Sequence, residues 1–494
     1  MLLWKFAVLS LSSQDPPLAA TVLTKHDRRT CLRGKAVEFL LVSLAKPLIQ
    51  LLNEKPLRRP IQIQKKADAE YRSEAVASRV QKKIAPKKPP RTFSTYLEDV
   101  TSIPEGSGVR YSVLRDCSSE PRGWVEGNLA SLMADTVQRV YAKFVEHVVR
   151  PDPLWELGWQ HLSLLSPNVV AYKGLQMSLQ KLPKKEDECT QNDMRISKCL
   201  FPHPNLNLVR GLLPPPSLPS LSHSSRYLLR DSCGIGTLAE LLPRHRESCA
   251  PQQTRQWLLM CMIQVLSAVE FIYSRAVCHR DIGLDCLHVT QYGEHWILKL
   301  GRFNYAVHRP GPLTAKSFVY SYEELRWLGG ADSRLPPEIL NTPEEVQTLD
   351  YSGTDIFAIG CLFYEFIGLD NPFEVNSQLA HKHYEVSDLP SLPPCRTSTQ
   401  RLAHLLLSRD PQTRPSPSTA LLLCQALLWL PEHWLDSKVT GLQLQEHLDY
   451  DRGILVASLA TMDIRPVPLP HVLQANFLQR CRVPDLLLAL HLLK

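Results

Sequence analysis

The sequence has few of the features that mark secreted, membrane-spanning or metal-binding proteins. Its 13 cysteines are scattered over 494 residues and none stands in a Cys-x-x-Cys pair, which excludes zinc ribbons and thioredoxin-type redox motifs. An odd number of scattered cysteines suits the reduced thiols of the cytosol. No run approaches the roughly 18 uninterrupted apolar residues of a membrane span, and residues 1–11 lack the basic start and cleavage site of a signal peptide. We therefore expect a cytoplasmic protein with no membrane span.

Glycine is scarce, and acidic residues are outnumbered by basic ones. There are 21 glycines against 39 prolines, and the net charge is +7. Residues 54–91 hold twelve Lys/Arg and four Asp/Glu, a local net charge of +8, so the remaining residues sum to −1. Tyr71 is the only aromatic residue in this stretch, whereas nucleic-acid-binding segments use aromatic side chains to stack on bases. We expect residues 1–125 to form a mostly disordered basic arm that binds no nucleic acid.

A proline motif ends the basic stretch. Residues 86–91 read Pro-Lys-Lys-Pro-Pro-Arg. Pro86 and Pro89 with Arg91 match a polyproline-II ligand, which docks on the aromatic groove of an SH3 domain while the arginine meets its acidic rim. The alternative is a solvated linker, because short Pro-x-x-Pro matches are common by chance. Tyr96, in Tyr-Leu-Glu-Asp, is a candidate phosphotyrosine site.

Residues 126–151 are predicted to form an amphipathic helix. Apolar side chains recur there at spacings of three and four, and Pro151 ends the pattern. Such an apolar stripe must be buried against another surface. The simplest such surface is the core of the same domain.

The rest of the chain predicts an α+β fold in which a small strand lobe precedes a large helical lobe. Short β-like runs fill residues 159–182, and a long helical pattern covers residues 254–275. Four landmarks then follow in the order found in protein kinases. They are His279-Arg280-Asp281, Leu335-Pro336-Pro337-Glu338, the helix that opens at Asp355, and Asp410-Pro411-Gln412-Thr413-Arg414-Pro415-Ser416. We expect a bilobal protein-kinase-like fold over residues 152–432.

The match to protein kinases implies structural roles for some of these landmarks. His279, Arg280 and Asp355 are expected to have structural rather than catalytic roles. Glu338 and Arg414 are expected to form a buried ion pair that ties the activation segment to the helical lobe. Removing one partner of such a pair would strand the other charge.

The catalytic loop has lost most of the residues that handle ATP. Gly283 stands for the lysine, Cys286 for the metal-binding asparagine, and Arg302 for the metal-binding aspartate. An arginine where Mg²⁺ requires a carboxylate reverses the charge of the site. We expect Arg302 to pair with Asp281 and to fill the metal position. These four residues are therefore predicted to be relics of a catalytic site.

The strand lobe also lacks its phosphate-binding parts. No glycine lies between Gly158 and Gly174, where the backbone amides of a glycine-rich loop would wrap phosphates. The strand lysine is either Lys173, in Val-Ala-Tyr-Lys, or Lys181, and either residue could equally be a solvated strand residue. We expect no bound cofactor and no metal.

Three further segments make the chain resemble one particular family of protein kinases. They are residues 371–375 (Asn-Pro-Phe-Glu-Val), 388–393 (Asp-Leu-Pro-Ser-Leu-Pro) and 402–407 (Leu-Ala-His-Leu-Leu-Leu). With these segments the chain resembles the PEAK/Pragmin family of pseudokinase scaffolds over about residues 128–494. The resemblance implies a catalytically inactive scaffold of tyrosine-kinase signalling in cytoskeleton and cell-migration control. The alternative is an atypical protein kinase that keeps weak ATP binding and phosphotransfer through Asp281.

The resemblance further implies a split dimerisation module and adaptor partners. In this family a helix before the kinase domain joins helices after it, which places the module in residues 126–151 and 433–494. The apolar residues expected at the interface are Leu132, Met133, Val137, Val140, Tyr141, Phe144, Leu455, Leu459, Leu486 and Leu490. The implied partners are a second copy or another family member, Crk-like SH3 adaptors, SH2 or PTB adaptors, and tyrosine kinases. The implied location is the cytoplasm, at the cytoskeleton or focal adhesions.

Overall fold

The computed structural model describes most of residues 122–494, and its longest gaps in that range are residues 322–333 and 374–383. Residues 1–121 lie outside the described residues, and with them the proline motif and Tyr96. The chain divides into two compact units, each described by itself. They are residues 134–452 with 464–494, and residues 1–133 with 453–463.

The smaller unit combines the start of one long helix with the end of another. Helix α6 (Arg122–Val148) supplies Met133, and helix α16 (Gly441–Thr461) supplies Gly453. Met133 Cε would lie 3.8 Å from a Cβ atom at Gly453, which is ordinary van der Waals contact. Helix α6 starts earlier than the predicted residue 126, so the last residues of the expected arm are helical.

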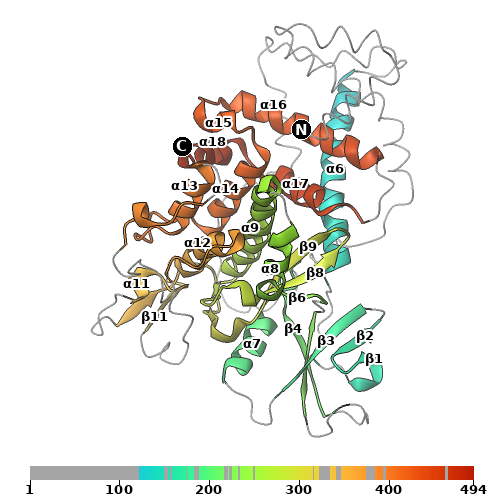
Figure 1. Cartoon of the computed structure of the whole chain (residues 1–494). Coiled ribbons are helices and arrows are strands. Elements are labelled where there is room, and N and C mark those ends of the chain that lie inside the picture. The colour runs from blue at the N-terminus through green and yellow to red at the C-terminus, as the bar shows by residue number, and fades with distance from the viewer. Residues whose placement is uncertain are drawn as a thin grey trace, which may run out of the picture. The chain divides into compact units, whose positions relative to one another are not determined.

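In the larger unit, the small lobe is a five-stranded antiparallel sheet with one helix, α7 (Glu188–Cys199) (Figure 1). In spatial order the strands are β1 (Ser163–Ser166), β2 (Val169–Tyr172), β3 (Leu175–Lys181), β5 (Tyr227–Asp231) and β4 (Val209–Leu213). Side chains alternate between the two faces of a strand. Met177, Leu179 and Leu229 belong to one buried apolar cluster, so their neighbours in β3 and β5 face the opposite side of the sheet.

The large lobe is built around α9 (Pro251–Tyr273). Leu258, Met262 and Val269 of this helix are fully buried. Among the residues that the structure describes, α9 is the one helix long and apolar enough to cross a membrane by length and composition. Its place in the core of the lobe accounts for that composition. The surrounding helices are α8 (Leu238–Ser248), α12 (Thr354–Ile367), α13 (Thr397–Leu406) and α14 (Pro417–Trp429).

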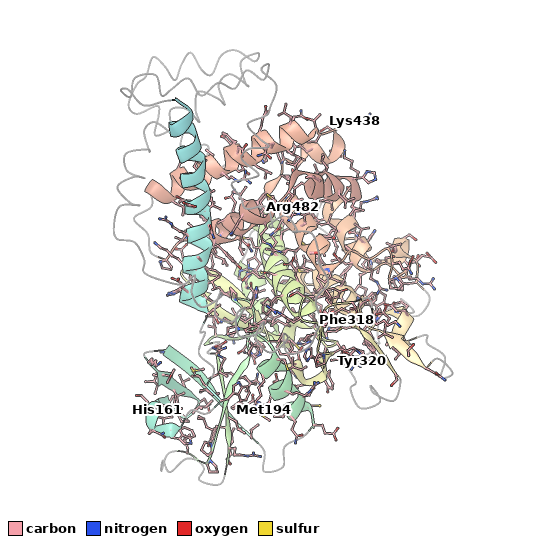
Figure 2. The ribbon with its side chains drawn as sticks, turned by 180° about the vertical axis from the view of Figure 1, so that it is seen from behind. His161, Met194, Phe318, Tyr320, Lys438 and Arg482 are labelled. Atoms are coloured by element: carbon pink, nitrogen blue, oxygen red, sulfur yellow. The ribbon has the colours of Figure 1, made fainter. Side chains whose placement is uncertain are left out.

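Short strands and turns complete the large lobe. The strands are β6 (Gly236–Thr237), β8 (Leu287–Tyr292) and β9 (His295–Leu300) in one sheet, β7 (Val277–Cys278) with β10 (Val307–His308), and β11 (Val319–Ser321) with β12 (Thr348–Asp350). The short helical segments are Trp159–His161 in the small lobe, and Leu284–Cys286, Phe303–Tyr305, α11 (Pro337–Leu340) and Val386–Asp388 in the large lobe. Phe318 and Tyr320 pack in an apolar cluster around β11 and β12 (Figure 2). The expected bilobal α+β architecture is confirmed.

Helices outside the two lobes pack on the large lobe within the same unit. Phe144 of α6 meets Tyr292 edge-on, with ring centroids 5.3 Å apart. Arg480, at the end of α17, forms an ion pair with Glu270 of α9 at 2.6 Å. The C-terminal helices are α15 (His433–Asp436), α16, α17 (Leu469–Arg480) and α18 (Val483–Leu492). Part of the apolar stripe of α6 is therefore covered by the chain's own large lobe.

Candidate catalytic and nucleotide site

The catalytic loop is held on α12 by its backbone. The carboxylate of Asp355 accepts hydrogen bonds from the amides of His279 at 2.7 Å and Arg280 at 2.8 Å. His279 Nε2 donates to the carbonyl of Gly301 at 2.9 Å, which ties the loop to the end of β9. Arg280 has a positive φ of 68°, and its guanidinium lies 4.5 Å from the centre of the Tyr351 ring. These contacts fix the shape of the loop independently of its catalytic residues.

The two metal-binding positions hold a thiol and a guanidinium. Cys286 Sγ donates to the backbone carbonyl of Asp281 at 2.9 Å, and burial raises the pKa of this thiol, which keeps it neutral. Arg302 forms an ion pair with Asp285. Mg²⁺ requires oxygen ligands. Within the described part of the chain, no group of three or more His, Cys, Asp or Glu residues could hold a metal ion.

The ion-pair partner of Arg302 differs from the one expected from the sequence. The expectation is Asp281, but the pair forms with Asp285, which lies four residues later on the turn Leu284–Cys286. Arg302 lies two residues after the end of β9, and its backbone is in the left-handed conformation, with a φ of 61°. Burial alone would lower the pKa of Arg302, but Asp285 and Asp281 are among the groups that raise it. Asp281 therefore acts on the guanidinium electrostatically.

Neither candidate lysine occupies the face of β3 that turns toward α7. Lys173 lies in the turn after β2, with a φ of 48°, and its ammonium lies 5.1 Å from the centre of the Tyr172 ring. Lys181 is exposed at the end of β3 and has the strand parity of Leu179, whose side chain is in the apolar cluster. On the opposite face, Gln180 accepts a hydrogen bond from Arg230 Nε at 2.9 Å.

Arg230 of β5 supplies the cation on this face. Its Nη2 lies 2.5 Å from Oδ2 of Asp193 on α7, and the two side chains are 12% and 1% exposed. The other carboxylate oxygen of Asp193 accepts the backbone amide of Phe303 at 3.3 Å. The preceding residue, Asn192, donates from Nδ2 to the carbonyls of Phe303, Asn304 and Ala306 at 3.2, 3.0 and 2.8 Å. Helix α7 is thus clamped to the segment that follows Arg302.

Sequence reasoning missed Asn192, Asp193 and Arg230. One signal for the pair was present, since an arginine in the otherwise apolar run Tyr-Leu-Leu-Arg needs a carboxylate partner once the strand is buried. It also missed His288 of β8, which interacts electrostatically with the members of both ion pairs. Burial, followed by the charges of Arg230 and Arg302, lowers the pKa of His288 to about 4, so the imidazole is neutral at neutral pH.

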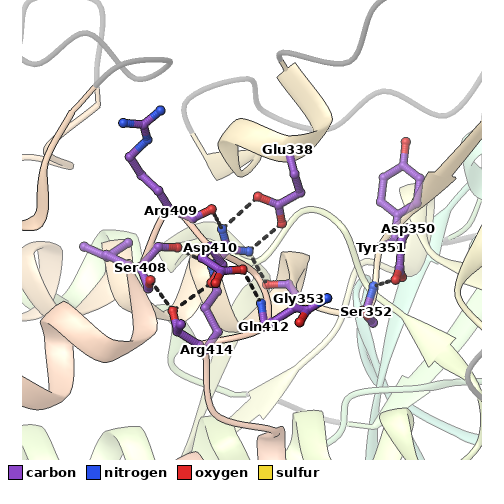
Figure 3. A network of polar contacts seen from close by, with 12 residues as sticks. Glu338, Asp350, Tyr351, Ser352, Gly353, Ser408, Arg409, Asp410, Gln412 and Arg414 are labelled. Carbon is purple, nitrogen blue, oxygen red and sulfur yellow. Dashed lines mark hydrogen bonds and ion pairs between the residues drawn. The ribbon is translucent and has the colours of Figure 1, made fainter. Parts of the chain in front are cut away.

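The end of the activation segment is fixed by Glu338 and Arg414. Arg414 donates from Nη1 and Nη2 to the two carboxylate oxygens of Glu338 at 2.5 and 2.7 Å, and from Nε to the carbonyl of Ser408 at 2.6 Å (Figure 3). The guanidinium also lies 5.1 Å from the centre of the Phe357 ring on α12. A bidentate arginine–carboxylate pair is among the strongest polar contacts in proteins. It anchors α11 to the helical lobe.

The part of the sequence that makes these contacts matches the profile of a known protein family. The profile of the protein kinase domain matches residues 163–425, which is more than half of the chain. The chain belongs to the protein kinase domain family. The landmarks at residues 279–281, 338, 355 and 414 all lie inside the matched range.

Relatives of this kinase domain include proteins named as serine/threonine-protein kinases and proteins named as inactive tyrosine-protein kinases. It is 30% identical over 263 residues to the serine/threonine-protein kinase Pink1, mitochondrial, of Tribolium castaneum, covering 48% of this chain and 44% of that protein. It is 27% identical over 235 residues to the inactive tyrosine-protein kinase PEAK1 of Homo sapiens, covering 44% of this chain and 13% of that protein. The chain thus spans less than half the length of either curated relative.

A solved structure shares the fold. The crystal structure of the pseudokinase PEAK1 matches with a TM-score of 0.56 at 21% identity, over 75% of this chain and 100% of that chain. At this identity the similarity shows the bilobal fold alone. Whether the chain transfers phosphate therefore has to be judged from the geometry of its site and not from its relatives.

The residues expected at a dimer interface fall into three groups within this kinase chain. Val137, Val140, Phe144, Leu455, Leu486 and Leu490 are buried. Met133, Tyr141 and Leu459 are half-buried. The side chain of Leu132 and the SH3-ligand residues Pro86, Pro89 and Arg91 lie outside the described residues. Dimerisation through these residues and binding of an SH3 domain by the proline motif stay predictions.

Proposed function

We propose that this kinase domain is a catalytically inactive pseudokinase that works as a scaffold. The observation that carries the proposal is the ion pair of Arg302 with Asp285 at the position where kinases hold Mg²⁺. Phosphoryl transfer relies on metal ions that bridge the phosphates and neutralise their charge. A guanidinium repels a divalent cation, and its partner Asp285 is already engaged.

The small lobe supports the same proposal. Strands β1 and β2 are joined by only two residues, Pro167 and Asn168, and proline has no backbone N–H to offer a phosphate. The cation that faces α7, Arg230, is engaged by Asp193 and Gln180. Among the described residues, the site therefore offers neither the amide cradle nor the lysine that position ATP in active kinases.

The rival function is an atypical kinase that transfers phosphate weakly through Asp281. Its support is that Asp281 keeps its place in a loop held by Asp355, and that Pink1 is named as a kinase. Asp281 alone can accept a proton, but it cannot position ATP without a metal. We therefore favour the inactive scaffold.

One pair of measurements decides between the two functions. The first is the melting temperature of the full chain with ATP, with and without Mg²⁺; the second is autophosphorylation of the wild type and of Asp281→Asn. We expect no Mg²⁺-dependent shift, and no phosphate transfer above the level of Asp281→Asn. Transfer that is lost in Asp281→Asn would establish the weak kinase.

The scaffold role includes partners and a location. The chain would dimerise, with itself or a PEAK/Pragmin relative, through residues 126–151 and 433–494. It would recruit Crk-like SH3 adaptors through Pro86, Pro89 and Arg91, and SH2 or PTB adaptors and tyrosine kinases. This work would take place in the cytoplasm, at the cytoskeleton or focal adhesions, in the control of cell migration.

A further inference from the structure

The space beside Gly283 is filled by a side chain from another part of the chain. A Cβ atom at Gly283 would lie 2.8 Å from Cζ and 2.9 Å from Nη1 of Arg334. Carbon and nitrogen atoms in contact lie about 3.5–4.0 Å apart. No side chain fits at residue 283 while Arg334 keeps this position. Arg334 precedes α11 by three residues, so it belongs to the end of the activation segment.

An arginine is flexible, so it would move aside at little cost unless it were held. Arg334 is held by Glu365 of α12, with Nη2 and Oε1 2.9 Å apart and side chains only 17% and 10% exposed. Burial alone would lower the pKa of Arg334, but Glu365 above all, and Asp285 to a smaller extent, raise it. The guanidinium is therefore charged, largely buried and fixed on α12.

The same region of the catalytic loop is approached by a second arginine. Asp285 Oδ1 lies 3.0 Å from the Cβ position of Gly283, and Asp285 forms the ion pair with Arg302. The carboxylate of Asp285 is thus flanked by Arg302 from the end of β9 and by Arg334 from the activation segment. In an active kinase the positive charge beside this loop comes from a lysine at the position of Gly283. Here Arg334 brings a positive charge to the position of that lysine.

We propose that Arg334 is a structural latch, which takes the space of the missing lysine over Gly283 and locks residues 334–340 onto the catalytic loop. The latch closes the site beside Asp281 from within, and the glycine at position 283 is the condition for its formation. The inference goes beyond the scaffold function, because it holds whether or not the chain binds a nucleotide or a partner.

Hydrogen–deuterium exchange of the full chain tests the latch. Exchange reports local opening of a segment. We expect Arg334→Ala to speed exchange on the order of tenfold in peptides that cover residues 334–340 and 281–287, as loss of a coupled contact does. Arg401→Ala, which removes an exposed arginine of α13, is the matched control and should leave both peptides unchanged. Unchanged exchange of residues 334–340 in Arg334→Ala overturns the proposal.

A substitution at Gly283 provides a second test of the latch. Gly283→Lys should displace Arg334, and so speed exchange of residues 334–340 as much as Arg334→Ala does. Adding Arg334→Ala to Gly283→Lys should cause no further increase and should recover part of the lost melting temperature, because the lysine then has room. Additive losses in the double variant would overturn the latch. If Gly283→Lys does not fold, Gly283→Ala takes its place with the same expected pattern.

The outcome of the exchange experiment does not depend on whether the chain is a pseudokinase scaffold. The exchange experiment uses neither nucleotide nor partner, so a failed latch leaves the pseudokinase scaffold standing. Conversely, phosphate transfer that depends on Asp281 would remove the scaffold function and leave the latch standing. In that case Arg334→Ala should raise the transfer rate.

Discussion

Arg230 of β5 and Asp193 of α7 form the ion pair that joins the sheet of the small lobe to its helix, with Nη2 and Oδ2 2.5 Å apart. Active kinases make this junction with a lysine of β3 and a glutamate of the helix. The present chain keeps an ion pair at the junction but takes the cation from the neighbouring strand. Because Asp193 also binds the amide of Phe303, the helix is fixed to the segment that follows Arg302 without any nucleotide.

Removing the cation of this pair should be costly. In Arg230→Met the carboxylate of Asp193 stays buried without its cation and keeps only the amide of Phe303, so we expect the free energy of unfolding to fall by about 3–5 kcal/mol. Urea denaturation followed by circular dichroism measures it. In the double variant Arg230→Met with Asp193→Leu, part of the loss should return, because a buried ion pair replaced by apolar side chains is often neutral.

An exposed pair of the same chemistry serves as the control. Arg409 and Glu385 lie 3.2 Å apart but are 41% and 74% exposed. Water screens such a pair, so Arg409→Ala should cost less than about 1 kcal/mol. A loss at Arg230 no larger than the loss at Arg409 would show that the Arg230–Asp193 pair does not hold α7 in place.

The sequence predicts the framework of this kinase domain better than its side-chain partners. The motifs around His279, Asp355 and Arg414 place the helical lobe, because each motif specifies buried contacts that only one fold provides. The partner of Arg302 is not predictable in this way, since two carboxylates lie four residues apart and only the turn between them selects Asp285. Spacing cannot pair Arg230 with a residue 37 positions away on another element.

Arg302→Asp tests whether the guanidinium blocks the metal position. The substitution removes the cation and adds an oxygen ligand next to Asp285, which is the donor type that Mg²⁺ prefers. We expect Mg²⁺ to raise the melting temperature of this variant by about 2 °C or more, and to leave the wild type unchanged. Arg302→Ala loses the ion pair without adding a ligand, so it should not respond. A folded Arg302→Asp variant that ignores Mg²⁺ would contradict the blockade.

Two half-buried histidines should make stability depend on pH. Burial lowers the pKa of His288 to about 4 and that of His203 to about 3, from an ordinary value of 6.5. Both are neutral in the folded chain, whereas the unfolded chain protonates them below about pH 6.5. The unfolded state then binds more protons, so their contribution is fully present above pH 6.5 and is lost as the pH falls toward 4.

The expected size is measurable by urea denaturation at two pH values. For each histidine, the free energy of unfolding should be about 2 kcal/mol lower at pH 5 than at pH 7. His288→Phe keeps an aromatic ring but cannot be protonated, so its loss between the two pH values should be smaller than that of the wild type. Equal losses in both proteins would mean that His288 is not held in its neutral form.

A test of the proposed dimer needs substitutions at exposed positions, because the buried apolar side chains already stabilise the single chain. Val137 and Phe144 are 3% and 4% exposed, and Phe144 packs on Tyr292. A charge at either position would destabilise the chain itself, and a change in mass would then have two explanations. Beyond residue 433, the large apolar side chains left exposed among the described residues are Leu442 of α16 and Leu488 of α18, at 53% and 54%.

Leu442→Glu and Leu488→Glu should therefore separate the dimer without unfolding the chain. If the C-terminal helices form the interface, each substitution buries a charge against the partner, and light scattering should show the mass of one chain where the wild type shows two. The melting temperature measured on the isolated monomer should match that of a control with equal exposure, Leu165→Glu on β1, which is 53% exposed and should keep the dimer. A dimer that survives both substitutions, or a wild type that is monomeric at micromolar concentration, would contradict an interface built on these helices.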